Sequence, residues 1–237
     1  MAYAGKIAAE VIKLLRSVIT AGATTKEIEQ FADAQIKARG GKSAFKGYRG
    51  YPASICASVN EEVVHGIPSS RKLRHGDIIS IDIGVYYEGF YGDAAYTFPV
   101  GTIDQVTARL LKVTEEALYL GIEKAVEGNR LYDISHAIQD HVEMHGFSVV
   151  RNFVGHGIGR QLHEEPQVPN FGAPGQGPRL RQGMTLAIEP MVNVGTFDVR
   201  VLEDGWTVVT ADCKRSAHFE HTVVVMPTSA RILTNYN

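Results

Sequence analysis

The amino-acid sequence predicts a single α+β domain in which helices cover one face of a curved, largely antiparallel β-sheet. Two observations predict this fold. Apolar residues recur at helical spacing in two separate regions, and each region is followed by segments with the alternation of half-buried strands. No Pro/Ser-rich linker divides the chain, so we expect residues 1–237 to form one domain with two halves, about 1–100 and 101–237.

The first half begins with two amphipathic helices. Apolar residues recur at helical spacing over residues 7–19, so the first twenty residues are predicted to form a helix with one buried face. In the second helix, Thr24 and Glu27 form a capping box, and Gly40 and Gly41 end the helix.

Strands are predicted from Tyr51 to Phe98, after which the order of helices and strands repeats. A helix is expected over about 104–125, another over about 133–145, and strands over 147–226. Two helices followed by strands, twice over, indicate an ancient duplication within one domain.

The composition is that of a globular protein with balanced charge. Apolar residues make up 44% of the 237 residues, which is enough for a substantial core. With 24 basic and 26 acidic residues, the formal net charge of −2 gives no general attraction to nucleic acid or to an anionic membrane. Charges interrupt any signal-peptide core, and no apolar run approaches the roughly 18 residues that span a bilayer. We therefore expect a cytoplasmic protein.

Several familiar types of site are excluded by spacing. Cys56 and Cys213 lack CxxC spacing, so neither a disulfide framework nor a cysteine zinc site is expected. A phosphate-binding loop would need a glycine where Ile36 stands, the GxGxG stretch from Gly155 does not open a βαβ unit, and no GxSxG elbow is present. The spacing thus argues against nucleotide-binding folds and the simplest serine hydrolases.

Asp82 and Asp93 lie eleven residues apart in a stretch that has the pattern of a β-hairpin. The apolar residues of the first strand alternate with Asp82, so this carboxylate points away from the core. If the chain turns about Tyr87 and Glu88, with Gly89 relieving backbone strain, the two aspartates become directly opposed. Carboxylates roughly 5 Å apart at Cβ repel each other unless a cation lies between them. The pair predicts either a metal site or, alternatively, a solvated acidic hairpin face.

Three later segments place residues of metal-binding type in unusual contexts. His156 lies between glycines that allow close approach of a substrate, and Glu189 interrupts an apolar strand, where a buried, unpaired carboxylate costs several kcal/mol. Glu220 shares a predicted strand face with His218 and Thr222. Four carboxylates would be neutralised by two divalent ions, and oxygen ligands with one imidazole suit Mn, Fe(II), Co or Zn.

In the sequences DIGVYYEGFYGD, GHGIG, AIEPM and FEHT, these residues resemble the five metal ligands of the type I methionine aminopeptidases, metallopeptidases with the pita-bread fold. The match runs from the first helix to Thr222 or beyond and includes the histidine of VVHGIP. Only 26 residues separate His163 from Glu189, which leaves no room for the helical insertion of type II enzymes. The chain resembles the short bacterial form, and the resemblance implies two pairs of helices over the sheet with an internal pseudo-twofold duplication.

The resemblance implies a role for each ligand. Asp82 is expected to bind one metal ion, and His156 and Glu189 chiefly the other. Asp93 and Glu220 are expected to bridge the two divalent ions, which the family implies to be Co, Mn, Fe(II) or Zn. Glu189 is also the family's candidate for moving the proton of the water nucleophile.

The resemblance also implies which residues contact the substrate. His65 and His163 are expected to be catalytic without binding metal, by contacting the scissile peptide and stabilising the tetrahedral intermediate. From the residues alone, His65 would be an ordinary loop histidine. Phe45 and Leu162 stand where the family commonly has a cysteine and a phenylalanine. The methionine pocket is expected to be lined by Tyr48, Tyr51, Cys56, His65 and Trp206.

The implied reaction removes the initiator methionine from nascent polypeptides whose second residue is small. Two alternatives remain. An Xaa-Pro aminopeptidase or prolidase-like peptidase usually carries a separate N-terminal domain, and a non-catalytic pita-bread binding protein would have lost ligands that this chain has. Nascent N-termini are the expected partners, with the ribosome as a candidate docking partner, and no nucleic-acid or membrane role is expected. We expect a monomer.

Overall fold

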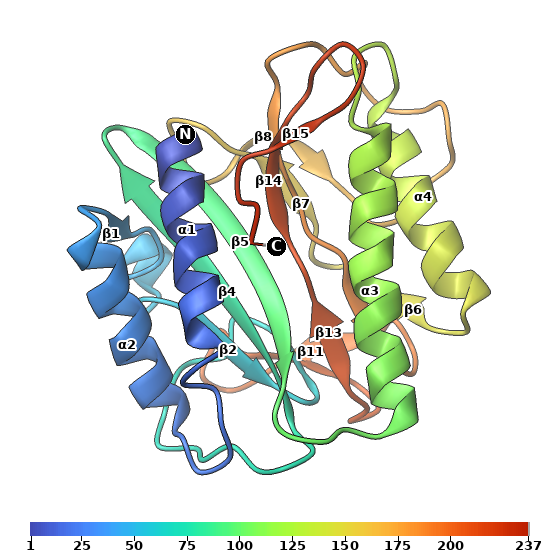
Figure 1. Cartoon of the computed structure of the whole chain (residues 1–237). Coiled ribbons are helices and arrows are strands. Elements are labelled where there is room, and N and C mark those ends of the chain that lie inside the picture. The colour runs from blue at the N-terminus through green and yellow to red at the C-terminus, as the bar shows by residue number, and fades with distance from the viewer. Residues whose placement is uncertain (237) are drawn as a thin grey trace.

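The computed structural model describes residues 1–236, and its α-helices lie in two pairs, one from each half of the sequence (Figure 1). The pairs are α1 (Ala2–Leu15) with α2 (Thr25–Ala38), and α3 (Gln105–Lys124) with α4 (Leu131–Met144). Among the described residues, no helix is both long and apolar enough to cross a membrane.

The helices form where the apolar spacing predicts them, with differences at their ends. α1 ends at Leu15, earlier than predicted, and Ile19 reaches the core from the turn that follows. α2 begins at the predicted capping box, in which the hydroxyl of Thr24 accepts from the backbone N–H of Glu27 and the carboxylate of Glu27 accepts in return. α4 begins at Leu131 rather than at residue 133, because the cap precedes Asp133 by three residues.

The strands are short, apart from one long hairpin made by β4 (Ile78–Tyr87) and β5 (Phe90–Pro99). The first half also contains a one-turn 3-10 helix (Tyr48–Gly50) and the strands β1 (Lys42–Ser43), β2 (Cys56–Val59) and β3 (Glu62–Val64). The strands of the second half are β6 (Ser148–Val149), β7 (Gly155–Gly157), β8 (Glu164–Val168), β9 (Thr185–Ile188), β10 (Met191–Asn193), β11 (Val199–Val201), β12 (Val208–Thr210), β13 (Ser216–His218), β14 (His221–Val224) and β15 (Arg231–Ile232).

The pairings between these strands are antiparallel, as predicted, and divide them into four hydrogen-bonded sheets within the described residues. The two halves meet at several places, two of which lie close to the strands described above. β3 of the first half pairs with β12 of the second. In the centre, where β5 and β14 run side by side (Figure 1), the hydroxyl of Thr222 accepts from the backbone N–H of Asp93 at 2.9 Å and donates to its carbonyl at 2.7 Å.

Two apolar clusters attach the helix pairs to the strands. The predicted inward face of β4, which includes Ile79, Ile81 and Ile83, is fully buried against α1 and α2. The second cluster packs α3 and α4 on side chains such as Leu186 and Phe219. Burying one such side chain contributes about 1.5–3 kcal/mol. Because side chains alternate along a strand, the polar residues of β4 lie on the face turned away from the helices.

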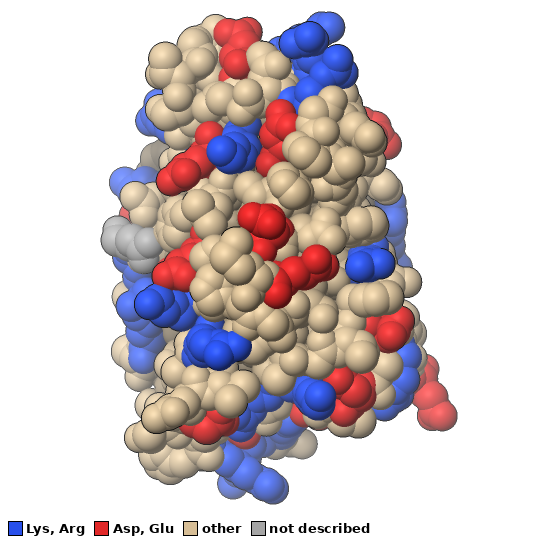
Figure 2. Space-filling model, turned by 90° about the vertical axis from the view of Figure 1, so that its right-hand side faces the viewer, with Lys and Arg blue, Asp and Glu red and all other residues tan. Residues whose placement is uncertain are grey.

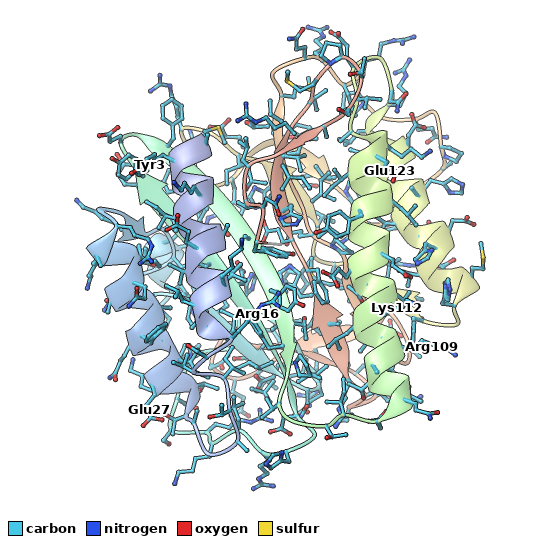
Figure 3. All side chains as sticks on the ribbon, viewed as in Figure 1. Tyr3, Arg16, Glu27, Arg109, Lys112 and Glu123 are labelled. Atoms are coloured by element: carbon cyan, nitrogen blue, oxygen red, sulfur yellow. The ribbon has the colours of Figure 1, made fainter. Side chains whose placement is uncertain are left out.

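An arginine lies between the two helix pairs. Arg16, which follows α1, points toward the centre of the molecule (Figure 3), and its guanidinium lies 5.0 Å from the centre of the Tyr96 ring. The Tyr96 ring also meets Phe219 and Tyr236 of the second half edge-on, at 4.9 and 5.2 Å between centroids. On the face beside α4, acidic side chains are interspersed with lysines and arginines (Figure 2), and that face carries no broad basic surface.

Candidate metal centre

The β4–β5 hairpin carries both aspartates, but they are diagonal neighbours and not directly opposed. Asp82 faces Ala95, two residues beyond Asp93 along β5. The prediction of a turn about Tyr87 and Glu88 was wrong by one residue. Glu88 and Gly89 have positive φ angles of 46° and 85° and form the two-residue turn that the twist of a hairpin favours. Diagonal side chains still share one face of the hairpin and remain within reach of each other.

The predicted ligands from the second half meet Asp93 in one cavity. Ligand atoms of Asp93, His156 and Glu220 all lie within 4.8 Å of one another. Glu189 directly follows β9, and its Oε1 lies 3.6 Å from Nε2 of His156. Asp82 lines the same cavity. The five side chains therefore come from β4, β5, β7, the end of β9 and the link between β13 and β14.

Several of these oxygens are buried without a hydrogen-bond partner in the part of the chain that the structure describes. They are Oδ1 of Asp82, Oδ1 of Asp93 and Oε1 of Glu220. Leaving such an atom unsatisfied costs about 1–3 kcal/mol, and more if the group is charged. A divalent cation removes this cost, and a set of carboxylates with one imidazole matches the ligand preference of Mn, Fe(II), Co or Zn. The residues present thus fit a site for divalent metal.

Burial disfavours the charged forms of these groups. It is the main reason why the pKa values of Asp82, Glu189 and Glu220 lie well above the usual range, and the nearby Asp93 adds to the effect. Burial raises the pKa of Asp93 itself to about 7 and lowers the pKa of His156 to about 4. A cation at this position reverses the shift of the carboxyl groups because it favours their charged forms.

His163 stands at the exposed side of the cavity. Its Nδ1 lies 2.8 Å from the hydroxyl of Tyr48, and its ring centroid lies 4.2 Å from that of His156. Partial burial, with a smaller contribution from Arg49, lowers the pKa of His163. The ring is therefore neutral near pH 7 and carries one N–H that it can donate.

His65 faces the same cavity from the loop after β3. Its ring is held edge-on by two aromatic rings, Phe153 at 5.6 Å and Trp206 at 6.3 Å between centroids. Burial is the main cause that lowers the pKa of His65 to about 4. A neutral, half-buried histidine that faces a cavity differs from the ordinary loop histidine that its sequence context favours.

The rest of the cavity is mainly apolar. The hydroxyl of Tyr51 lies 3.1 Å from the carbonyl oxygen of Ile55 and 3.0 Å from that of Gly66, so it can donate to either and is fixed in place. Its ring meets Trp206 edge-on at 5.1 Å. All five predicted pocket residues line this cavity, together with Phe45 and Leu162: Tyr48, Tyr51, Cys56, His65 and Trp206.

Some residues around the site were not predicted to belong to it. Arg49, Phe153 and Met191 also line the cavity. Asn170 donates from Nδ2 to the carbonyl oxygen of Glu189 at 3.0 Å, and the ring of His218 lies 3.7 Å from the carboxylate of Glu189. Phe153 and Asn170 lie in loops without periodic patterns, and Met191 and His218 lie in short strands, so only their three-dimensional contacts reveal them. His218 was noted only because it shares a strand face with Glu220.

The chain is similar to known proteins in both sequence and structure. The sequence model of metallopeptidase family M24 matches residues 1–227. The methionine aminopeptidase of Clostridium perfringens and methionine aminopeptidase 1 of Bacillus subtilis are each 55% identical over 234 residues, which is 99% of this chain and 94% of each relative. The crystal structure of a methionine aminopeptidase from Thermotoga maritima has a TM-score of 0.98 at 51% identity and covers 99% of this chain and 95% of that one. A prolidase from Pyrococcus horikoshii shares the fold, with a TM-score of 0.81 at 21% identity over 100% of this chain and 61% of that one.

Proposed function

The chain belongs to metallopeptidase family M24 and is a metal-dependent aminopeptidase that removes N-terminal methionine, and we propose that it does so with five side chains holding two divalent ions. The observation that supports this most directly is the set of buried, unpartnered carboxylate oxygens around one cavity. The proposed ligands are Asp82, Asp93, His156, Glu189 and Glu220.

In this arrangement Asp82 would hold one ion and His156 and Glu189 would hold the other, while Asp93 and Glu220 would bridge them. The mutual approach of Asp93, His156 and Glu220 to within 4.8 Å supports an ion held jointly by these three residues. Four carboxylates also need the charge of two divalent ions for neutrality. Their oxygen-rich chemistry makes Mn, Fe(II), Co and Zn the candidate ions.

When bound, the ions supply an activated water near neutral pH and polarise the scissile carbonyl. The remaining chemistry belongs to the side chains. Glu189 takes the proton from the nucleophilic water and passes it to the leaving amine. The Tyr48 hydroxyl donates to Nδ1 of His163, which leaves the ring proton on Nε2, and His163 donates that proton to the oxyanion of the tetrahedral intermediate. His65 is neutral and contacts the scissile peptide.

The methionine side chain of the substrate binds against Tyr48, Tyr51, Cys56, His65 and Trp206. The edge-on contact between Tyr51 and Trp206 supports a rigid wall there. Such a pocket discriminates against a misfit of one methylene by about 1–3 kcal/mol, so the preference for methionine is strong but not absolute. Phe45 and Leu162 set the shape of the remaining wall.

Residues 1–237 act as one catalytic domain in this proposal, because the ligands come from both halves: Asp82 and Asp93 from about 1–100, and the other three from 101–237. The substrates are the N-termini of nascent polypeptides. We place the enzyme in the cytoplasm as a monomer, with the ribosome as a candidate docking partner. The balanced net charge of −2 supports a protein without a nucleic-acid or membrane role.

The proposal is tested by comparing a Met-Ala-Ser peptide with an Xaa-Pro peptide before and after treatment with EDTA. We expect cleavage of Met-Ala-Ser that EDTA abolishes and that Mn, Co or Fe(II) restores. If Met-Ala-Ser stays intact with metal supplied while the Xaa-Pro peptide is cut, the protein is a prolidase-like enzyme. If neither peptide is cut, it is a binding protein.

A further inference from the structure

His218 is a buried histidine that the proposed mechanism does not use. It is the last residue of β13, and only 1% of its surface is exposed. Its Nε2 atom is buried and has no hydrogen-bond partner within residues 1–236. Burying a polar atom without a hydrogen-bond partner is unfavourable, so an acceptor is expected close to this nitrogen.

The nearest carboxylate is that of Glu189. Nε2 of His218 lies 3.7 Å from Oε2 of Glu189, while the other oxygen, Oε1, lies 3.6 Å from Nε2 of His156. The carboxylate therefore lies between two imidazole rings, and each oxygen is only slightly beyond hydrogen-bond range. Oε2 comes within hydrogen-bond range of His218 if the two atoms approach by about 0.5 Å.

The surroundings keep the His218 backbone in place. Thr97 of β5 accepts a hydrogen bond from the backbone N–H of His218 at 2.9 Å, and its hydroxyl also lies 2.8 Å from the carbonyl oxygen of His218. The Thr97 hydroxyl is bonded in turn to Ser80 of β4 at 2.8 Å. In the pairing of β10 with β13, His218 stands opposite Met191, two residues after Glu189. The ring is thus presented to Glu189 from a fixed strand.

We propose that His218 is a positioning residue for the reaction, in which its Nε2–H donates to Oε2 of Glu189 and keeps Oε1 directed toward His156 and the metal centre. This inference rests on the proposed role of Glu189. A carboxylate that moves a proton has to present the same oxygen to the water in every cycle, and a donor on the other oxygen restricts its rotation. Burial keeps the hydrogen bond strong because little water competes for it.

The test uses two variants with side chains of similar length and shape. His218→Gln keeps an N–H donor near the position of Nε2, whereas His218→Met fills the same space without a donor. Both full-length variants are loaded with Co²⁺ or Mn²⁺, and four quantities are measured: kcat, KM for Met-Ala-Ser, bound metal and melting temperature.

We expect His218→Met to lower kcat about tenfold or more, as for the loss of a hydrogen bond to a charged group. KM and metal content should stay within about twofold, because His218 is not among the residues that line the cavity. His218→Gln should retain kcat within about threefold of the wild type. Rescue by Gln and not by Met is a result that a merely structural role would not give.

Three outcomes overturn the inference. His218→Met could keep the wild-type kcat, His218→Gln could lose as much activity as His218→Met, or both variants could lose metal, which would make His218 a ligand. If His218→Met does not fold, His218→Asn replaces it, since its amide is too short to reach Glu189 and should behave as the donor-free variant. Failure of the wild type on Met-Ala-Ser would instead refute the proposed function, so the two failures are distinguishable.

Discussion

At the scale of single residues, the cavity holds carboxyl groups whose pKa values are raised and histidines whose pKa values are lowered, in both cases chiefly by burial. The protein therefore favours neutral side chains until a cation arrives. Metal binding requires deprotonated carboxylates, so it is coupled to the release of protons. The free energy of metal binding thus offsets the unfavourable burial of these carboxyl groups in the folded chain.

Replacing Asp93 by asparagine tests this coupling. Asp93→Asn removes one bridging carboxylate and one source of repulsion, so we expect at least a tenfold loss of metal affinity, or about 1.4 kcal/mol, with little change in the melting temperature of the metal-free protein. Calorimetric titration with Co²⁺ and melting curves in EDTA measure the two effects. The control is Asp140→Asn on the exposed side of α4. A large loss of metal-free stability with unchanged metal affinity would contradict this assignment.

His65 and His163 provide a second residue-scale prediction. His65→Ala and His163→Ala each remove a group that contacts the substrate, so turnover should fall about 100-fold or more, as for other groups of this kind. Bound metal, measured by atomic emission, should remain near the wild-type value. Loss of metal from either variant would move that histidine into the set of ligands.

The five proposed metal ligands stand out in the sequence because each is a charged or polar residue in an apolar or glycine-rich segment, and the structure brings them to one cavity. The residues that contact and position these ligands could not be predicted. Asn170 bonds the backbone of Glu189 from a loop, and the two residues are 19 positions apart. Nothing in the local pattern around Asn170 marks that contact.

At the scale of secondary structure, helix starts were predictable to within two residues and strand register was not. The capping box of Thr24 and Glu27 is a local signal and was confirmed. The register of the β4–β5 hairpin depends on whether Glu88 adopts a positive φ angle. Glutamate has no special preference for that conformation, so the sequence suggested a turn one residue too early.

Asp104 gives a prediction about the start of α3. Its carboxylate accepts from the backbone N–H of Thr107 at 2.8 Å, and this bond, with smaller contributions from the Thr107 hydroxyl and Arg215, lowers the pKa of Asp104 to about 2. Asp104→Ala should cost about 1 kcal/mol of stability at pH 7, as for other helix caps.

The pH dependence of that loss has a definite sign. The folded protein holds Asp104 ionised at a lower pH than the unfolded chain does, so its contribution is present above about pH 4 and disappears as the pH falls toward 2. Denaturant melts of the wild type and of Asp104→Ala at pH 7 and pH 2 measure it. A stability difference that persists at pH 2 would mean that the carboxylate does not act as the cap.

At the scale of the whole molecule, the metal centre lies where the two halves join. The repeated order of helices and strands predicted two halves, but the contacts that join them were not predictable. Thr222 and Asp93 are separated by 129 positions, and their mutual hydrogen bonds leave no trace in either local pattern. The Tyr96 ring, which packs against both apolar clusters, is a further contact of this kind.

Removal of metal should therefore affect both halves together. We expect EDTA to lower the melting temperature, because bound ions stabilise only the folded state, and to speed amide exchange in β5 and β14 more than in α2. Hydrogen exchange followed by mass spectrometry measures this, with α2 as the internal reference. Faster exchange in the first half alone would mean that the second half does not depend on the ions.

The bonds between Thr222 and Asp93 can form only late in the synthesis of the chain. A growing chain leaves the ribosome from its N-terminus, so the β4–β5 hairpin emerges long before Glu220 and Thr222 do. Until then, the two aspartates of the hairpin lack the proposed ligands of the second half with which they would share a cation. An enzyme molecule therefore becomes active only after most of its own chain has been translated. A nascent polypeptide is processed by enzyme molecules whose synthesis finished earlier.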